Sequence, residues 1–107
     1  MNEIEIFFHP EAMEEYVASY AWYYERGAHL AEAFEYEIER ALRLIVDAPE
    51  RWPTYAGRYR RMLVRRFPFS LVYTSTETKP AIIAVAHGHR KPGYWRKRKI
   101  EKIFNEQ

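Results

Sequence analysis

The sequence predicts an α+β fold, in which a mainly antiparallel sheet of three to four strands packs against an N-terminal helical hairpin. Before residue 50, apolar residues recur every three or four positions over two long segments, as they do in amphipathic helices. After residue 59, three apolar runs rich in β-branched and aromatic residues are separated by breaks of turn length, as strands are. The expected order is strand-helix-helix-strand-strand-strand. A chain of 107 residues suits a single domain over 1–107, with a basic C-terminal tail from about residue 91.

A short strand and a first helix open the chain. Residues 3–8 alternate polar and apolar side chains and then turn aromatic, which predicts a strand added to the sheet edge. Pro10 suits the first turn of a helix and Gly27 suits its end, so a helix is expected over 10–26. Its apolar residues form one stripe that is expected to pack on the sheet: Met13, Tyr16, Val17, Tyr20, Ala21 and Tyr24. Its acidic residues lie off the stripe, where solvation is expected: Glu11, Glu14, Glu15 and Glu25.

A second helical pattern runs from about His29 to Asp47, and Pro49 ends it. Its apolar face consists of Leu30, Phe34, Ile38, Ala41, Leu42 and Ile45. Only a few residues connect the two helices, which predicts an antiparallel hairpin. Neither helix is expected to be stable alone in water, so both should pack on the sheet.

Residues 47–57 are predicted to form a connecting loop, and three strands are expected over 60–66, 69–75 and 81–87. Phe67-Pro68 separates the first two strands, because proline cannot donate to a central ladder. Residues 76–80 separate the last two. Connections this short make consecutive strands antiparallel partners. With the hairpin on one face, the other face of the sheet is expected to be free for a partner.

The two halves of the chain carry opposite charge. Residues 1–50 hold 3 Lys and Arg against 12 Asp and Glu, whereas residues 51–107 hold 14 against 3, and the whole chain has a formal charge of +2. Such asymmetry favours an anionic partner for the basic half. The alternative is that the two halves neutralise each other within one fold.

Composition excludes several classes of protein. The absence of cysteine rules out a disulfide scaffold and thiolate metal sites, and 48% hydrophobic residues are enough for a core. No apolar run is long enough for a membrane span, and the N-terminus lacks a basic, apolar signal, so a soluble cytoplasmic protein is expected. His87 and His89 share one side of an extended strand, but no further ligand accompanies them, so neither a metal nor any other cofactor is expected.

The order of elements, together with particular motifs, resembles the RelE/ParE superfamily of bacterial toxins from toxin–antitoxin pairs. The motifs are Tyr23-Tyr24-Glu25-Arg26, Pro49-Glu50-Arg51-Trp52-Pro53, Arg60-Arg61, Arg65-Arg66-Phe67-Pro68-Phe69 through Tyr73, and His87-Gly88-His89-Arg90-Lys91-Pro92-Gly93-Tyr94-Trp95. They cover about 90 residues in order. The chain is most similar to the ParE-like branch, often labelled plasmid-stabilisation proteins.

The RelE branch cleaves messenger RNA on the ribosome by organising a phosphate with cations. If the resemblance extends to that chemistry, it implies that Arg61, Arg90 and Tyr94 would be the catalytic residues. The sequence departs from the RelE pattern at two other positions, where Leu63 and Ser70 stand in place of a lysine and an arginine. Ribosome-dependent messenger-RNA cleavage is therefore the alternative function.

The ParE branch is understood to bind DNA gyrase and trap its cleaved complex without chemistry of its own, and a cognate antitoxin neutralises it. The resemblance thus implies a non-catalytic gyrase inhibitor in a toxin–antitoxin hetero-oligomer. An acidic antitoxin segment is expected to fold across the basic sheet. The expected target-binding residues lie at or just beyond the ends of adjacent strands: Arg65, Arg66, His87, Arg90, Tyr94 and Trp95.

Three of these expectations have alternatives. Arg90 could instead pair with a carboxylate of the helical hairpin, His87 could fill a hydrogen bond in the core, and Trp95 could pack onto the edge of the core. The run Arg96-Lys97-Arg98-Lys99 is expected to be solvated. If Arg90 and Trp95 are surface residues, replacing either with alanine should abolish toxicity and leave the fold intact, whereas Leu42→Ala should unfold the protein.

Overall fold

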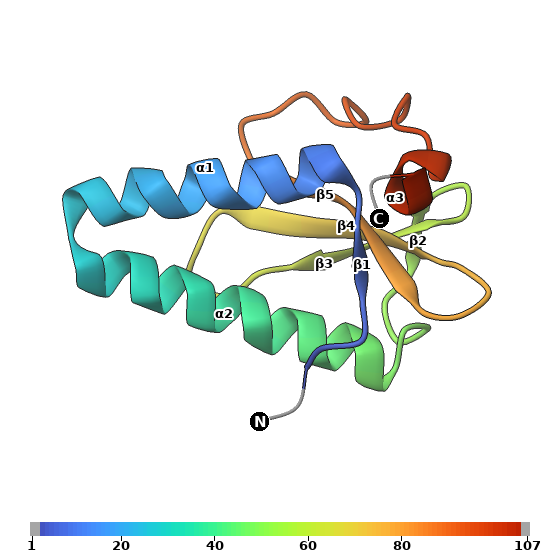
Figure 1. The fold of residues 1–107 in the computed structure, drawn as a ribbon, viewed down its shortest axis with the longest axis horizontal. Helices are drawn as coiled ribbons and strands as arrows, with labels where there is room; N and C mark the ends of the chain where they lie inside the picture. The colour runs from blue at the N-terminus through green and yellow to red at the C-terminus, as the bar shows by residue number, and fades with distance from the viewer. Residues whose placement is uncertain (1–2, 106–107) are drawn as a thin grey trace.

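The computed structural model describes residues 3–105, which form two long helices and a five-stranded sheet (Figure 1). In chain order the elements are β1 (Phe7–Phe8), α1 (Pro10–Arg26), α2 (Ala28–Asp47), β2 (Thr54–Ala56), β3 (Tyr59–Leu63), β4 (Phe69–Ser75), β5 (Pro80–His87) and α3 (Glu101–Asn105). The predicted α+β class and the N-terminal helical hairpin are confirmed. The sheet has five strands rather than three or four, because residues 54–56, expected to be part of a loop, form an edge strand.

The strands lie in the order β1-β5-β4-β3-β2. All neighbouring pairs are antiparallel except β1 and β5, which run parallel, so the first strand does join the sheet at its edge. Strand β3 ends at Leu63 instead of reaching residue 66. Arg66 has a φ angle of 71°, and this left-handed conformation turns the chain before Phe69 begins β4.

The helical hairpin begins and turns at the residues that the sequence indicates. The side chain of His9 caps α1 by accepting a hydrogen bond from the Glu11 amide at 3.1 Å, and Pro10 occupies the first helical position. Gly27 alone connects the helices, with a φ angle of 155° that residues with side chains rarely adopt. A single-residue connection places α1 and α2 side by side in antiparallel orientation (Figure 1).

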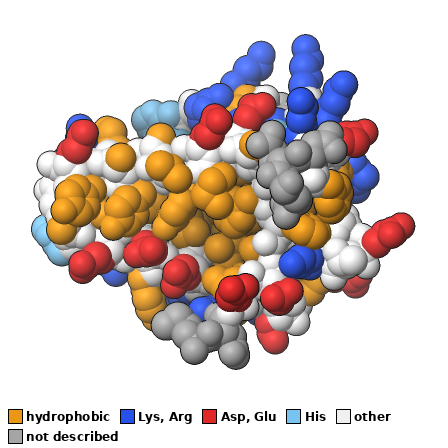
Figure 2. All heavy atoms as spheres, in the orientation of Figure 1, with side chains coloured by type: hydrophobic (Ala, Val, Ile, Leu, Met, Phe, Trp, Pro, Cys, Tyr) orange, Lys and Arg blue, Asp and Glu red, His pale blue; other side chains and the backbone are white. Residues whose placement is uncertain are grey.

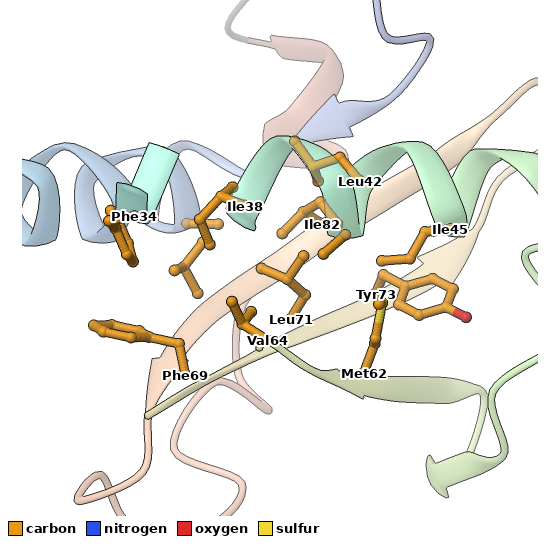
Figure 3. Close-up of a cluster of buried hydrophobic side chains, with 13 residues drawn as sticks. Phe34, Ile38, Leu42, Ile45, Met62, Val64, Phe69, Leu71, Tyr73 and Ile82 are labelled. Carbon is orange, nitrogen blue, oxygen red and sulfur yellow. The ribbon is translucent and has the colours of Figure 1, made fainter. Parts of the chain in front are cut away.

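The main core lies between the hairpin and one face of the sheet. The predicted face of α2 is buried at Phe34, Ile38, Ala41, Leu42 and Ile45, whereas Leu30 is only partly buried. Figure 3 shows Phe34, Ile38 and Ile45 of α2 pointing toward Phe69, Leu71 and Tyr73 of β4. The stripe predicted for α1 is wrong in part, because Met13, Val17 and Tyr24 are exposed. Tyr16 and Tyr20 of that stripe do pack against the main core, and α1 also turns Ala12 and Tyr23 inward, which the pattern did not include.

The sequence suggested that the opposite face of the sheet is free for a partner, but in the structure this face is partly covered. The segment 92–104, here called the C-terminal strap, crosses it and buries Trp95 and Ile103 against Val72 and Ile83 in a second apolar cluster. The ring of Phe104 packs edge-on against the ring of Phe7, with 5.2 Å between the ring centres. The strap therefore belongs to the fold, and only the part of this face that it leaves uncovered can receive a partner. Within the described residues no helix is long and apolar enough to cross a membrane.

Candidate functional site

A small hollow, here called the basic hollow, lies on the sheet face turned away from the helical hairpin. Its volume is about 100 Å³. The polar residues that line it come from four strands and the segment after β5: Tyr55, Arg61, Ser70, His87, Arg90, Lys91 and Tyr94. They meet because side chains alternate along a strand. In β4, Phe69, Leu71 and Tyr73 face the main core, so Ser70 and Val72 face the hollow.

The strand register fixes which residues are neighbours on this face. Arg61 of β3 lies opposite Val72 of β4, and Leu63 lies opposite Ser70. The two positions at which the sequence departs from the RelE pattern are thus cross-strand partners. Arg61, Arg90 and Lys91 remain as the cations of the hollow among the described residues. The pair Leu63 and Ser70 offers an apolar side chain and a hydroxyl where two cations would otherwise stand.

Arg61 is held at one side of the hollow by Tyr55. Its guanidinium carbon lies 4.2 Å from the centre of the Tyr55 ring, within the range of a cation–π contact. Tyr55 was missed by the sequence analysis, which placed it in a loop. A strand of three residues is too short for its alternation to be recognised, so no pattern in the sequence could have identified it.

Arg90 and Tyr94 form a stack at the other side. The guanidinium carbon of Arg90 lies 3.7 Å from the centre of the Tyr94 ring, and Arg98 lies 5.1 Å from the same centre. The Tyr94 hydroxyl donates to Oε2 of Glu15 on α1 at 2.7 Å. Burial and this hydrogen bond raise the pKa of Tyr94 above its ordinary value. The hydroxyl is therefore committed to Glu15 and remains protonated at neutral pH.

Glu15 joins the hairpin, the sheet and the strap. It accepts hydrogen bonds from the Val85 amide at 2.9 Å and from two nitrogens of Arg98 at 3.0 and 2.6 Å. Arg90 lies 3.9 Å from it, so Arg90 does pair with a carboxylate of the hairpin, while its own side chain stays 53% exposed. The expectation that Glu15 is solvated is wrong, because its side chain is only 16% exposed. Arg98, in the run expected to be solvated, is 9% exposed.

His87 marks the end of β5 and lines one side of the hollow. Its ring packs edge-on against the ring of Phe69, with 5.0 Å between the ring centres. Its Nδ1 accepts a hydrogen bond from the His89 amide at 3.0 Å. The two imidazoles lie 4.9 Å apart. Between residues 3 and 105 no group of three or more His, Asp or Glu side chains is arranged to hold a metal ion.

Two of the expected target-binding residues lie outside the hollow. Arg65 and Arg66 are exposed in the turn between β3 and β4 and are not among its lining residues. The guanidinium of Arg66 lies 3.9 Å from the buried carboxylate of Glu37 on α2. They were placed with the others because β3 was expected to continue to residue 66, and its early end separates them from Arg90.

Trp95 lines the hollow from beneath, as part of the second apolar cluster. It is 2% exposed, and its ring packs edge-on against Tyr59 at 4.9 Å. The expectation that it is a surface residue is therefore wrong, and the alternative in which it packs onto the edge of the core is observed. Lys91, by contrast, lines the hollow and was not selected, although it directly follows Arg90 in the sequence.

Comparison with known families agrees with the arrangement of the elements. No curated protein matches the chain. A family model described as "ParE toxin of type II toxin-antitoxin system, parDE" matches residues 6–92, which is more than half of the chain. The matched region includes Arg61, His87, Arg90 and Lys91 and ends before Tyr94. The chain belongs to the ParE toxin family of type II toxin–antitoxin systems.

Proposed function

We propose that this toxin inhibits DNA gyrase by binding it, without chemistry of its own, and that a cognate antitoxin neutralises it in a cytoplasmic hetero-oligomer. The observation that carries the proposal is the pairing of Leu63 with Ser70 beside the basic hollow. Phosphoryl transfer depends on positioned charges that stabilise the transition state. A binding surface does not need those two cations, and Arg61, Arg90 and Lys91 still give it a positive character.

The experiment is a pair of assays on the purified protein. Gyrase supercoiling should be inhibited and cleaved DNA should accumulate, while ribosome-bound messenger RNA stays intact. Arg90→Ala should reduce the gyrase effect, because Arg90 lines the hollow and its side chain is about half exposed. Cleavage of ribosome-bound message that disappears in Arg90→Ala would reverse the assignment.

Messenger-RNA cleavage is the second candidate, since Arg61, Arg90 and Tyr94 do line the same hollow. In this candidate Arg61 and Arg90 would bind the phosphate. Tyr94 would serve as a proton donor only after leaving Glu15, to which its hydroxyl donates at 2.7 Å. Tyr94→Phe distinguishes the two candidates, because it should lower an RNase activity and leave binding of gyrase largely unchanged.

The antitoxin is proposed to cover the basic hollow with an acidic segment. The strap already occupies part of this sheet face, so the segment would lie along the cations that remain accessible, Arg61, Arg90 and Lys91. Association between opposite charges at an exposed rim weakens with salt. The affinity of the antitoxin should therefore fall as ionic strength rises, and charge-removing variants of Arg61 and Lys91 should reduce that salt dependence.

A further inference from the structure

The outer side of α1 carries an apolar stripe that the rest of the described chain covers only in part, at Tyr16 and Tyr20. It consists of Met13, Tyr16, Val17, Tyr20 and Tyr24 and is here called the α1 stripe. Met13, Val17 and Tyr24 are 42%, 55% and 57% exposed. Figure 2 shows hydrophobic side chains gathered in a row over α1 on the face toward the viewer. The stripe is the same set of residues, apart from Ala21, that the sequence pattern assigned to the core.

The stripe is continuous rather than a scatter of exposed side chains. Tyr16, Tyr20 and Tyr24 follow one another at four-residue steps, with ring centres 6.4 and 6.3 Å apart. Met13 and Val17 repeat at the same step beside them. At a rise of 1.5 Å per residue the stripe is about 16 Å long, or three helical turns. A single exposed apolar residue needs no explanation, but a contiguous apolar surface marks an interaction site.

Acidic side chains border the stripe. On α2, Glu32, Glu35 and Glu39 repeat at three- and four-residue steps. The Tyr16 ring stacks on Phe34 of α2 with ring centres 5.7 Å apart, which places the following residue, Glu35, beside the stripe. Burial raises the pKa of Tyr16, and the negative charges of Glu35 and Glu39 add to this effect. Figure 2 shows acidic side chains on both sides of the hydrophobic row.

The cations of the hairpin lie elsewhere. Arg26 stacks on Trp22 at 3.5 Å, and Trp22 points away from Tyr20 and Tyr24 because residues two positions apart on a helix do not share a face. Arg40 and Arg43 line a hollow on the other side of Glu39, together with Tyr36, Leu44 and Asp47. The border of the stripe is thus negative.

We propose that the α1 stripe is the docking surface for an amphipathic helix of a partner protein, with Lys and Arg along both borders of its apolar face. A straight apolar row of three turns matches the apolar face of a second helix lying alongside. Basic borders on that helix would meet Glu35 and Glu39 and be favoured, whereas acidic borders would be repelled. This surface is separate from the basic hollow, so the inference holds whatever the target of the toxin is.

A second copy of this chain does not fit the same surface. Two-fold pairing of stripe on stripe uses the same patch on both copies. It would therefore bring the acidic borders of the two copies together, where like charges oppose association. The occupant must carry the opposite charge.

The test uses two synthetic 18-residue peptides with the same helical pattern of leucines, one bordered by lysine and the other by glutamate. Titration by calorimetry should show the lysine peptide binding at least about tenfold more tightly, a difference of about 1.4 kcal/mol. Amide chemical shifts should move at Val17 and Tyr24. Val17→Arg should weaken binding of the lysine peptide about tenfold or more, and Glu35→Lys with Glu39→Lys should invert the preference between the two peptides.

Two matched variants control for exposure and charge. Leu63→Arg places the same new charge on another highly exposed apolar residue, and Glu101→Lys reverses a charge on α3, outside the stripe. Neither should change binding of the lysine peptide. The proposal is overturned if both peptides bind equally, if Val17→Arg has no effect, or if the protein self-associates at micromolar concentration and Val17→Arg restores the monomer. That last result would assign the stripe to a second copy.

Discussion

Arg98 of the strap and Glu15 of α1 together form hydrogen bonds to backbone groups of β5 that lie beyond the end of β1. Nη2 of Arg98 lies 2.6 Å from Oε2 of Glu15. Strand β1 accompanies β5 only as far as Ile82, whose carbonyl accepts from the His9 amide at 2.8 Å. Beyond it, Arg98 donates to the Ile83 carbonyl at 2.9 Å and Glu15 accepts from the Val85 amide at 2.9 Å. Two side chains thus continue the ladder where the short strand ends, because buried backbone groups need partners.

Removing Glu15 should therefore destabilise the whole fold. Glu15→Ala leaves the largely buried guanidinium of Arg98 with only the exposed carboxylate of Glu11, 3.3 Å away, and leaves the Val85 amide without an acceptor. Breaking one side of a buried ion pair typically costs about 3–5 kcal/mol. Urea unfolding should show a loss of that size in the free energy of unfolding.

Glu14→Ala is the matched control, because Glu14 is the exposed neighbour on the same helix and should change stability by less than about 0.5 kcal/mol. The double variant Glu15→Ala, Arg98→Met should be more stable than Glu15→Ala alone, since it removes a largely buried charge that has lost its buried partner. Equal effects of Glu14→Ala and Glu15→Ala would show that the pair contributes nothing to stability.

Trp95→Ala is expected to fail by unfolding and not by losing contact with a target. Trp95 is the residue of the strap that is buried against Tyr59, and truncation of a buried tryptophan costs about 3–5 kcal/mol. Leu42→Ala, in the main core, should cost about 2–5 kcal/mol for the same reason. Melting curves measured beside a growth assay decide the point. A Trp95→Ala protein that melts like the wild type but is not toxic would restore Trp95 to the target-binding surface.

Stability should fall in mild acid because of His9. Burial lowers its pKa below 6.5, although Glu11 and Glu15 nearby oppose this effect and Arg98 adds to it. Between the two pKa values the unfolded chain binds a proton that the folded protein does not. The contribution of His9 to stability is thus fully present above pH 6.5 and is lost as pH falls below 6.5 through the folded-state pKa.

His9→Asn should remove this component and keep a side-chain acceptor at the start of α1. The difference in free energy of unfolding between wild type and variant should therefore change between pH 7 and pH 5. His89→Asn, at an exposed position, controls for the loss of an imidazole. A constant difference across this range would contradict the assignment to His9.

Tyr16 should make the stability of the fold depend on pH in the alkaline range. Burial, reinforced by Glu35 and Glu39, raises its pKa to about 12, compared with about 10 in the unfolded chain. Its stabilising contribution is present below pH 10 and is lost as pH rises from 10 towards 12. The loss of stability over this range should be smaller in Tyr16→Phe than in wild type, with Tyr36→Phe as the control at an exposed position. An identical alkaline profile in Tyr16→Phe and wild type would contradict it.

The sequence was sufficient for the elements whose signals are local. Pro10 and Gly27 determine the ends of α1, and the apolar face of α2 is regular because that helix faces one core only. The direction of α1 was not predictable in the same way. Its aromatic residues surround more than half of the helix, so Tyr23 and Tyr24 are equally plausible core residues until the hairpin fixes which one meets Phe34.

The candidate site was predictable only where it follows strand ends. His87 and Arg90 were identified because they close β5, whereas Glu15 was not, because its partners Val85 and Arg98 are 70 and 83 residues away. A carboxylate on a helix surface has no local mark that distinguishes a solvated position from one that accepts four hydrogen bonds. The position of Arg66 was predicted wrongly because the left-handed residue in the turn after β3 is an arginine, and a glycine, the usual sequence signal for this conformation, is absent there.

The basic hollow and the turn between β3 and β4 are two alternative surfaces for binding the target, and single substitutions distinguish them. Arg90 lines the hollow, and its side chain is 53% exposed, so Arg90→Ala can remove a target contact while the second cluster and the Glu15–Arg98 pair stay intact. Arg65 is also exposed but lies in the turn outside the hollow. Arg90→Ala should therefore weaken inhibition of gyrase about tenfold or more, equivalent to at least about 1.4 kcal/mol, and Arg65→Ala should not. Both variants should melt within a few degrees of wild type. Loss of inhibition in Arg65→Ala with full activity in Arg90→Ala would move the target-binding surface from the hollow to the turn between β3 and β4.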